Sequence, residues 1–443
     1  MDFKMTPEQK EKLDNAIKNF DAEIISNEPP SKLPLLNDYK AKYIDKKYFN
    51  DTGVLFIQHH LGPFIPKVME MREDGMDPAR SWFVDIPYST NIDTKLMLVK
   101  NGFDEKKMTT IFNDPLDDYE KNQSDRIKFL LFKLANKSDD RNLLVIDDGA
   151  YFLRFLHSAN IHDPELAKIF TGTRIVEQTT RGHRFIENQA EEIIKKFKLN
   201  VVSIARCDTK INFESRFIGA AVARALTNRI GDDKLSEMQF ISVIGFGAVG
   251  RATTERLLTK SPMAKIDIID IDKSKREEAM TLSSRITSLK SLNKKQEYEL
   301  IVGCTGYTSL ELADRKLLVN GAYLASGSSA AVEFNRQGFV ELADKYPDDE
   351  IEILDRKESV NHGIHADILF SQEGGKKFTF LNAGFPINFD GKMESQPPRI
   401  IQVIHTLLYS AAIQVVENYN PGVLQRINEE KDHWIFNNAF NYL

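Results

Sequence analysis

Cysteine is scarce in this sequence, and long apolar runs are missing. The 443 residues include two cysteines, Cys207 and Cys304. Two cysteines about a hundred residues apart cannot form a disulfide framework or a structural zinc site on their own. The longest apolar runs fall well short of the ~18–20 residues that a membrane-spanning helix needs. The N-terminus also lacks the apolar core of a signal peptide. We therefore expect a cytoplasmic protein without a membrane partner.

An excess of positive charge is missing as well. Lys and Arg total 59, Asp and Glu total 65, and the formal net charge is −6. This balance argues against a nucleic-acid partner, because nucleic acid favours basic surfaces. Hydrophobic residues make up 42% and charged residues 28% of the chain, which is an ordinary globular mixture. At roughly 150 residues per domain, the length predicts about two to three domains.

The sequence offers little to a metal ion. His362 and His365 have the H-x-x-H spacing, but neither a cysteine nor a clear third ligand stands near them. We expect surface loop histidines here and no metal site. Cys304 follows an apolar run in a Gly-Cys-Thr-Gly segment, and we expect it to be a small packing residue rather than a nucleophile.

Short apolar runs alternate with helical stretches from about residue 53 onward. The runs VLFIQ (54–58), WFVDI (82–86) and LLVID (143–147) are typical of buried strands in a parallel sheet. A second alternating block begins near residue 215. The pattern predicts an α/β fold with two doubly wound, Rossmann-like domains and a cleft between them.

The strongest motif in the chain is a glycine-rich turn between a strand and a helix. The strand FISVI (240–244) runs into Gly245, Gly247 and Gly250, and a helical stretch follows. In such a turn the glycines permit a tight bend, a close approach to a pyrophosphate and close packing of helix on strand. Asp270 ends the next strand, where a carboxylate accepts hydrogen bonds from a ribose 2′-hydroxyl and repels a 2′-phosphate. The motif therefore predicts binding of NAD rather than NADP.

The position of this motif divides the chain. We expect an N-terminal helical arm at 1–50, a substrate domain at 51–212 and an NAD-binding domain at 213–384. Residues 385–443 would return to the substrate domain, and an apolar helix at 398–418 would close the structure.

Several further motifs occur in order between about residue 53 and about residue 420. The motifs are Gln58-His59-His60, Pro87-Tyr88-Ser89-Thr90-Asn91, Asp147-Asp148-Gly149, Glu177-Gln178-Thr179-Thr180-Arg181-Gly182, Lys210 through Glu214, and Leu381-Asn382-Ala383-Gly384. Together with the glycine turn, their order and spacing resemble those of S-adenosylhomocysteine hydrolase.

The resemblance implies an enzyme that holds NAD and uses it as an internal redox catalyst. Oxidation of a ribose 3′-hydroxyl acidifies the 4′-hydrogen, the 5′-thiol leaves, water adds, and the ketone is reduced again. Lys210 and Glu214 would handle the hydroxyl proton, although the family has aspartate at the position of Glu214. His59 and Asp148 would lie near C5′.

The resemblance also implies the binding residues and the assembly. It places Ser89, Thr90, Asn91 and Gln178 on a nucleoside-like substrate. Family members form dimers and tetramers, so it implies a homo-oligomer. The residues expected to contact NAD are Gly245, Gly247, Ala248, Val249, Gly250, Asp270, Thr179, Thr180, Arg181, Ser215, Thr305, Gly327 and Asn382.

The sequence departs from the family mainly at substrate positions. Gln178 stands in place of a ribose-binding glutamate, and the chain lacks the family's Lys-Pro-Asp-His-Tyr-Arg-Tyr tail. Two hypotheses stay open: an adenosylhomocysteinase-like enzyme acting on a nucleoside or nucleoside-like substrate, and a non-catalytic NAD-binding regulatory homologue. The other departures are Ser328 or Ser329 and Phe389 or Asn388 in place of two histidines, and Pro63 in place of an adenine-reading glutamate.

Overall fold

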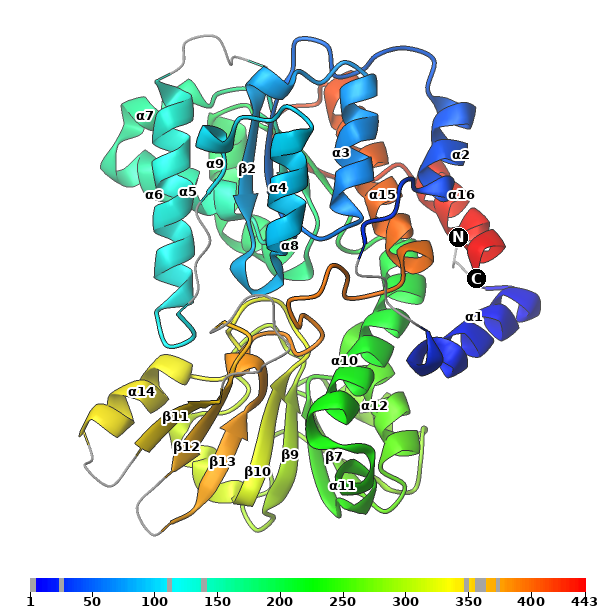
Figure 1. Cartoon of the computed structure of the whole chain (residues 1–443), viewed down its shortest axis with the longest axis vertical. Helices are drawn as coiled ribbons and strands as arrows, with labels where there is room; N and C mark the ends of the chain where they lie inside the picture. The colour runs from blue at the N-terminus through cyan, green and yellow to red at the C-terminus, as the bar shows by residue number, and fades with distance from the viewer. Residues whose placement is uncertain are drawn as a thin grey trace.

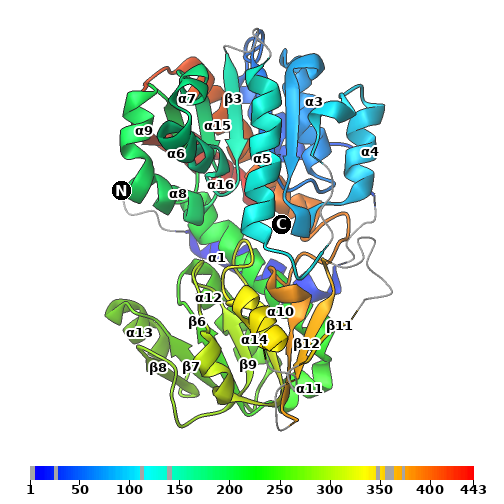
Figure 2. The same cartoon turned by 90° about the vertical axis from the view of Figure 1, so that its left-hand side faces the viewer.

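The chain folds into two lobes, each built on its own β-sheet (Figures 1 and 2). The computed structural model describes residues 5–23, 28–109, 114–136, 142–345, 350–354, 364–371 and 375–443. Within them, one sheet has six strands and the other has eight. The predicted α/β fold with two Rossmann-like domains is confirmed.

The first sheet is parallel throughout, in the order β14-β5-β4-β3-β1-β2. This order reverses direction between β1 and β3, so the loops that follow these two strands diverge and leave a crevice at their carboxyl ends. The strands are β1 (Gly53–Gln58), β2 (Ser81–Asp85), β3 (Leu143–Asp147), β4 (Arg174–Glu177), β5 (Asn200–Ser203) and β14 (Val423–Arg426).

Helices cover both faces of the first sheet, and the strand side chains alternate between them. Leu55 and Ile57 of β1 pack in one core cluster, whereas Val54 and Phe56 pack in the other. The first face carries α5 (Tyr119–Ala135), α6 (Tyr151–His162), α7 (Pro164–Ile169) and α9 (Glu191–Lys196), and the opposite face carries α2 (Pro34–Tyr43), α3 (Phe64–Glu73), α15 (Pro398–Glu417) and α16 (Glu429–Ala439).

The helix α15 closes the first lobe, as the apolar run at 398–418 predicts. By length and composition alone it could cross a membrane, but 72% of its most apolar window is buried inside the protein. Its residues pack against β3, β4 and β5, so α15 is a core helix of this lobe.

The second sheet has the order β11-β12-β13-β10-β9-β6-β7-β8. The six strands from β13 to β8 are parallel, and β12 and β11 extend the sheet in antiparallel fashion. The order reverses direction between β6 and β9. The strands are β6 (Phe240–Ile244), β7 (Lys265–Ile269), β8 (Ile286–Leu289), β9 (Tyr298–Gly303), β10 (Leu318–Ser326), β11 (Glu350–Leu354), β12 (Asp367–Ser371) and β13 (Lys377–Phe380).

Two stretches connect the lobes. The helix α10 (Ser215–Ile230) leads into the second lobe and packs on α12 (Ala248–Lys260), and residues 385–397 lead back to α15 (Figure 1). The expected boundary between 212 and 213 falls inside a π-helical turn, Lys210–Glu214, just before α10. The remaining helices are α4 (Ile92–Lys100), α8 (Thr180–Phe185), α11 (Asp232–Glu237), α13 (Lys273–Met280) and α14 (Arg336–Lys345).

The N-terminal segment packs on the body of the protein. The helix α1 (Pro7–Asn19) begins with the expected capping box, in which Thr6 and Gln9 bond each other's backbone. The hydroxyl groups of Tyr39 in α2 and Ser410 in α15 lie 2.8 Å apart. The expected helical arm therefore contains two helices that contact both lobes.

Candidate functional site

A cavity of about 320 Å³ lies between the lobes, where the carboxyl ends of both sheets face each other. Its lining comes from the loops after β1, β3, β4 and β5 of the first sheet and after β6, β9 and β10 of the second. Ligands of open α/β sheets bind at such carboxyl ends, at the point where the strand order reverses. Both reversal points open onto this one cavity.

The glycine turn has the geometry that a pyrophosphate requires. Gly245 has a φ of +94°, which favours glycine. A Cβ on Gly250 would lie 1.9 Å from the carbonyl oxygen of Gly245, whereas a Cβ on Gly247 would meet nothing within 4 Å. Gly247 caps α12 without a side-chain hydrogen bond. The first backbone N–H groups of α12 are therefore left for an anion in the cavity.

Asp270 lies beside this turn, at the end of β7. Its carboxylate accepts hydrogen bonds from the backbone N–H groups of Phe246 at 2.7 Å and Asp272 at 2.8 Å. The acid is therefore held next to the glycine turn, as the motif predicts, although it does not line the cavity itself. The predicted cofactor residues that do line it are Gly247, Ala248, Val249, Thr179, Thr180, Arg181, Ser215, Thr305 and Gly327.

Asn382 requires a correction. Its side chain is fully buried and satisfied inside the second lobe, because its amide donates to the carbonyls of Pro386 and Phe389. Its carbonyl oxygen accepts from Arg229 at 2.8 Å. Asn382 is not among the described residues that line the cavity. It holds the return segment in place rather than contacting a cofactor.

Glu333, which the sequence did not single out, holds the rim of the cavity together. Its buried carboxylate accepts from the backbone N–H groups of Thr305 at 2.7 Å and Gly306 at 2.6 Å, and from the hydroxyl of Ser328. Burial raises the pKa of Glu333. One acid thus joins the loop after β9 to the loop after β10.

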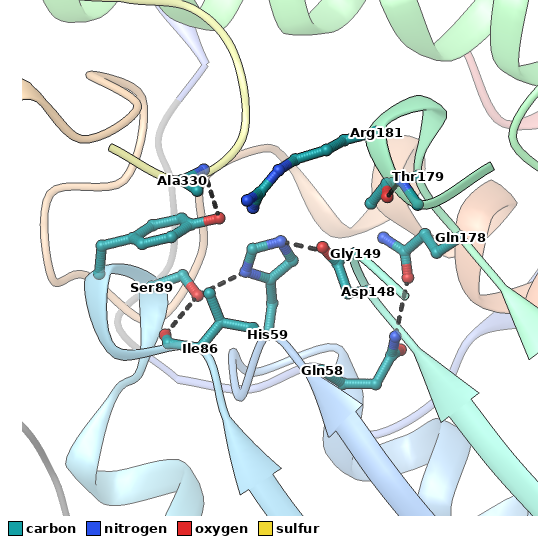
Figure 3. Close-up of polar contacts among 12 residues, drawn as sticks. Gln58, His59, Ile86, Ser89, Asp148, Gly149, Gln178, Thr179, Arg181 and Ala330 are labelled. Atoms are coloured by element: carbon teal, nitrogen blue, oxygen red, sulfur yellow. Dashed lines mark hydrogen bonds and ion pairs between the residues drawn. The ribbon is translucent and has the colours of Figure 1, made fainter. Parts of the chain in front are cut away.

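His59 and Asp148 meet at the reversal point of the first sheet (Figure 3). The Nε2 atom of His59 lies 3.3 Å from a carboxylate oxygen of Asp148. The hydroxyl of Ser89 donates to the carbonyl of Ile86 at 2.9 Å, so it accepts from Nδ1–H of His59. The Nε2 atom of His59 therefore faces the Asp148 carboxylate at the cavity wall.

Lys210 and Glu214 lie on the π-helical turn below the cavity. The ammonium of Lys210 is 3.1 Å from the Glu214 carboxylate and donates to the backbone carbonyl of Gln178 at 3.1 Å. Burial acts to lower the pKa of Lys210, but the charge and hydrogen bond of Glu214 outweigh it, and the pKa is raised. Lys210 is therefore a cation in this arrangement.

A chain of hydrogen bonds fixes the side chain of Gln178. The buried Lys67 donates to the Gln58 carbonyl at 3.0 Å, and the Gln58 amide donates to the Gln178 carbonyl at 3.0 Å (Figure 3). Burial lowers the pKa of Lys67 to about 7, but its amino group donates to Gln58 in either form and so sets the direction of both amides. Gln178 thus keeps its NH₂ group for the cavity, and presents a donor where a glutamate would present an acceptor.

Ser89, Thr90 and Asn91 also require a correction. None of the three is among the described residues that line the cavity, and all are at least 97% buried. Ser89 orients His59, Thr90 donates to Asp85 at 2.8 Å, and Asn91 accepts from the backbone of Asp93 and donates to Gly391. These residues support the site from behind rather than contacting a substrate.

Aromatic and small side chains stand where the resemblance expects histidines. Phe389 stacks on the ring of His59, with centroids 4.8 Å apart and planes at 22°. Ser328, Ser329 and Asn388 line the cavity nearby. The prediction of a surface histidine is wrong for His365, which is fully buried and does not line the cavity. His362 lies outside the described residues. Among the described residues, there is no group of three or more His, Cys, Asp or Glu side chains placed to hold a metal ion.

The comparisons with known proteins leave the activity open. No family model matches the chain. Two uncharacterised proteins from two strains of Mycobacterium tuberculosis are 29% identical to it over 216 residues, which is 49% of this chain. The match spans 36% of the length of each relative, so the chain corresponds to about a third of those proteins.

Solved structures with a similar backbone include three proteins whose names describe oxidoreductases or a synthase. The pyruvate reductase of Chlamydomonas reinhardtii matches with a TM-score of 0.30 and 14% identity, over 67% of this chain and 75% of that one. The dipicolinate synthase A chain of Bacillus subtilis matches with a TM-score of 0.33 and 8% identity, over 66% of this chain and 84% of that one. The L-tryptophan dehydrogenase of Nostoc punctiforme matches with a TM-score of 0.27 and 15% identity, over 65% of this chain and 72% of that one. Similarity at this level carries no argument about function.

Proposed function

We propose that this protein is an NAD-dependent enzyme that acts on a nucleoside or nucleoside-like substrate through transient oxidation of a ribose hydroxyl. The observation that carries the proposal is the single cavity between the lobes. One wall offers the glycine turn and the start of α12, and the other offers Lys210 with Glu214 and His59 with Asp148.

The residues present fit a nicotinamide dinucleotide. The open space at Gly247, the uncapped N-terminus of α12 and the carboxylate of Asp270 suit a pyrophosphate and an adjacent ribose diol. Thr305 and Gly327 would flank the nicotinamide half. When bound, the cofactor would supply a hydride acceptor and donor.

The polar residues of the first lobe can handle the protons that such a reaction moves. Glu214 can accept the proton of a substrate hydroxyl, and the Lys210 ammonium can stabilise the resulting oxyanion. His59, held beside Asp148, would donate a proton to a leaving group on the far side of the cavity. The Gln178 amide would donate to an acceptor atom of the substrate.

The test uses the purified full chain loaded with NAD and mixed with S-adenosylhomocysteine. Mass spectrometry follows adenosine and homocysteine, and near-ultraviolet absorbance follows reduced nicotinamide. Release of both products would support adenosylhomocysteinase-like activity. A second mixture contains adenosine in place of S-adenosylhomocysteine. If adenosine reduces the nicotinamide but S-adenosylhomocysteine releases no products, the result would support oxidation of a different nucleoside. Tight NAD binding with neither signal would favour the non-catalytic regulatory homologue and overturn the proposal.

A further inference from the structure

The end of the cavity next to α15 contains polar side chains without partners. Glu394 and Gln396 lie on the segment that leads into α15, and His405 lies on α15 itself. Their exposed fractions are 2%, 3% and 9%. Both carboxylate oxygens of Glu394, Oε1 of Gln396 and Nδ1 of His405 have no hydrogen-bond partner among the described residues. Because buried polar groups are normally paired, these groups await a ligand.

The walls around these groups are apolar. Leu61, Pro63, Ile401, Ile404 and Leu408 line the same part of the cavity. A pocket with apolar walls and a few convergent polar atoms suits a flat apolar ring that carries polar atoms on one edge. Neither the composition nor the resemblance singled out Glu394, Gln396 or His405.

The protonation state of Glu394 determines which hydrogen-bond donors and acceptors the polar edge of the ligand ring must carry. Burial raises the pKa of Glu394 to about 8, so near neutral pH the carboxyl group presents an O–H donor beside a carbonyl acceptor. Burial lowers the pKa of His405 well below its usual value, and its ring is neutral. The other titratable side chains that line the cavity are His59, Asp148, Arg181, Arg184, Lys210, Glu214 and Cys304.

We propose that Glu394 and Gln396 determine specificity by binding the amino-substituted edge of a nitrogen heterocycle. The ring nitrogen would accept from the Glu394 carboxyl group, and the adjacent amino group would donate to its carbonyl oxygen. The second amino hydrogen would donate to Oε1 of Gln396. The proposal rests on the proposed function, which places a nucleoside-like substrate in the same cavity.

An aliphatic ammonium ion is the main rival occupant, and pH separates the two. A cation needs Glu394 in its ionised form, so its affinity would rise as the pH passes about 8. A neutral amino heterocycle needs the protonated form, because an ionised carboxylate repels the lone pair of the ring nitrogen. Its affinity would fall over the same range. Removal of a cation from water into these apolar walls is also costly.

The experiment measures binding of adenosine, purine riboside and butylammonium to the full chain loaded with NAD. Purine riboside differs from adenosine only in lacking the amino group. Calorimetry at about pH 6.5 and about pH 9.5 covers both forms of Glu394. We expect adenosine to bind at least about 10-fold more tightly than purine riboside, with this advantage falling at the higher pH.

Two variants of Glu394 separate its role from a packing role. Glu394→Leu should lose the preference for adenosine over purine riboside. Glu394→Gln keeps a donor beside an acceptor, so it should keep that preference but lose its pH dependence. Glu417→Gln is the matched control, because Glu417 is exposed at the C-terminal end of α15. Thermal melts of each variant establish that the chain is folded.

The outcomes distinguish this inference from the proposed function. Unchanged preference in Glu394→Leu, or tighter binding of butylammonium at high pH, would overturn the inference. Nicotinamide reduction by adenosine in the same variant would then leave the proposed function standing. Conversely, the native protein could prefer adenosine over purine riboside in a way that depends on Glu394, yet show no nicotinamide reduction. That result would support this binding site and overturn the proposed redox function.

Discussion

The ammonium of Lys210 lies 3.1 Å from the carboxylate of Glu214, one turn further along the same π-helical segment. The charge and hydrogen bond of Glu214 raise the pKa of Lys210 despite its burial. A protonated lysine cannot accept a proton. In the proposed reaction Glu214 would therefore be the base, and Lys210 would be the cation that stabilises an oxyanion.

Lys210→Ala should abolish turnover while the chain still binds NAD. The substitution removes the cation and leaves Glu214 without its partner, whereas the glycine turn lies on the opposite wall. We expect a loss of about 10²–10⁴-fold in turnover and little change in the NAD dissociation constant. Steady-state assays and fluorescence titration measure the two quantities. Lys195→Ala, at an exposed position on α9, is the control. Unchanged turnover would show that Lys210 has no part in the chemistry.

Asp270→Ala should weaken NAD binding and relax discrimination against NADP. The carboxylate that would hold the ribose diol also repels a 2′-phosphate, so its removal affects the two cofactors in opposite directions. We expect NAD to bind about 10-fold more weakly, which corresponds to about 1.4 kcal/mol. Parallel titrations with NAD and NADP measure the ratio, and Glu277→Ala on the exposed side of α13 is the control. Equal affinities before and after the change would mean that Asp270 does not read the ribose.

The strands could be predicted from the sequence because they are apolar runs that end in turn residues. Residues 143–147 and 240–244 form β3 and β6 with the predicted bounds. The edge strand β14, Val423–Arg426, could not be predicted from the sequence, because it is partly exposed and contains polar residues. Its position depends on pairing with β5, which is more than 200 residues earlier in the chain.

Residues of the site could be predicted only where the residue type itself indicates a function and stands at a fixed sequence distance from a recognisable motif. The glycine turn and Asp270 belong to this class, whereas only the resemblance singled out Lys210 and Glu214. Asn382 occurs in a matching motif, yet its contacts with Arg229 and with residues 385–397 turn it inward. Glu333 and Glu394 could not be found, because their importance depends on the groups around them in space: among the described residues, five donors reach Glu333 and none reaches Glu394.

Ser89→Ala should slow turnover without weakening NAD binding. Ser89 accepts from Nδ1 of His59 and so keeps Nε2 directed at Asp148. Without this partner the imidazole can adopt the other tautomer or rotate, and we expect a loss of about 10-fold or more in turnover. The pH profile is the informative measurement, because its acidic or basic limb should move. Thr308→Ala, outside the cavity lining, is the control, and an unshifted profile would contradict the role of Ser89.

Gly219→Ala should destabilise the protein, although alanine usually favours a helix. A Cβ at Gly219 in α10 would lie 2.5 Å from the Cβ of Ala252 and 2.7 Å from the backbone nitrogen of Thr253 in α12. The two helices would have to separate, which costs about 1–3 kcal/mol. Without this close approach the same change would stabilise the helix by about 0.5–1 kcal/mol. Chemical denaturation gives the sign, and stabilisation would contradict the packing of α10 on α12.

The buried carboxyl group of Glu394 should make the stability of the free protein depend on pH. Burial raises its pKa from 4.5 to about 8, so the folded chain keeps a proton that the unfolded chain releases. The contribution of this group to stability is therefore complete below about pH 4.5 and is lost as the pH rises to about 8. Glu394→Gln cannot ionise, so the variant should gain stability relative to the native protein across this window, by about 1 kcal/mol or more. Urea denaturation at several pH values measures the difference, with Glu417→Gln as the control. Parallel pH profiles for Glu394→Gln and the native protein would show that Glu394 ionises freely in the folded state.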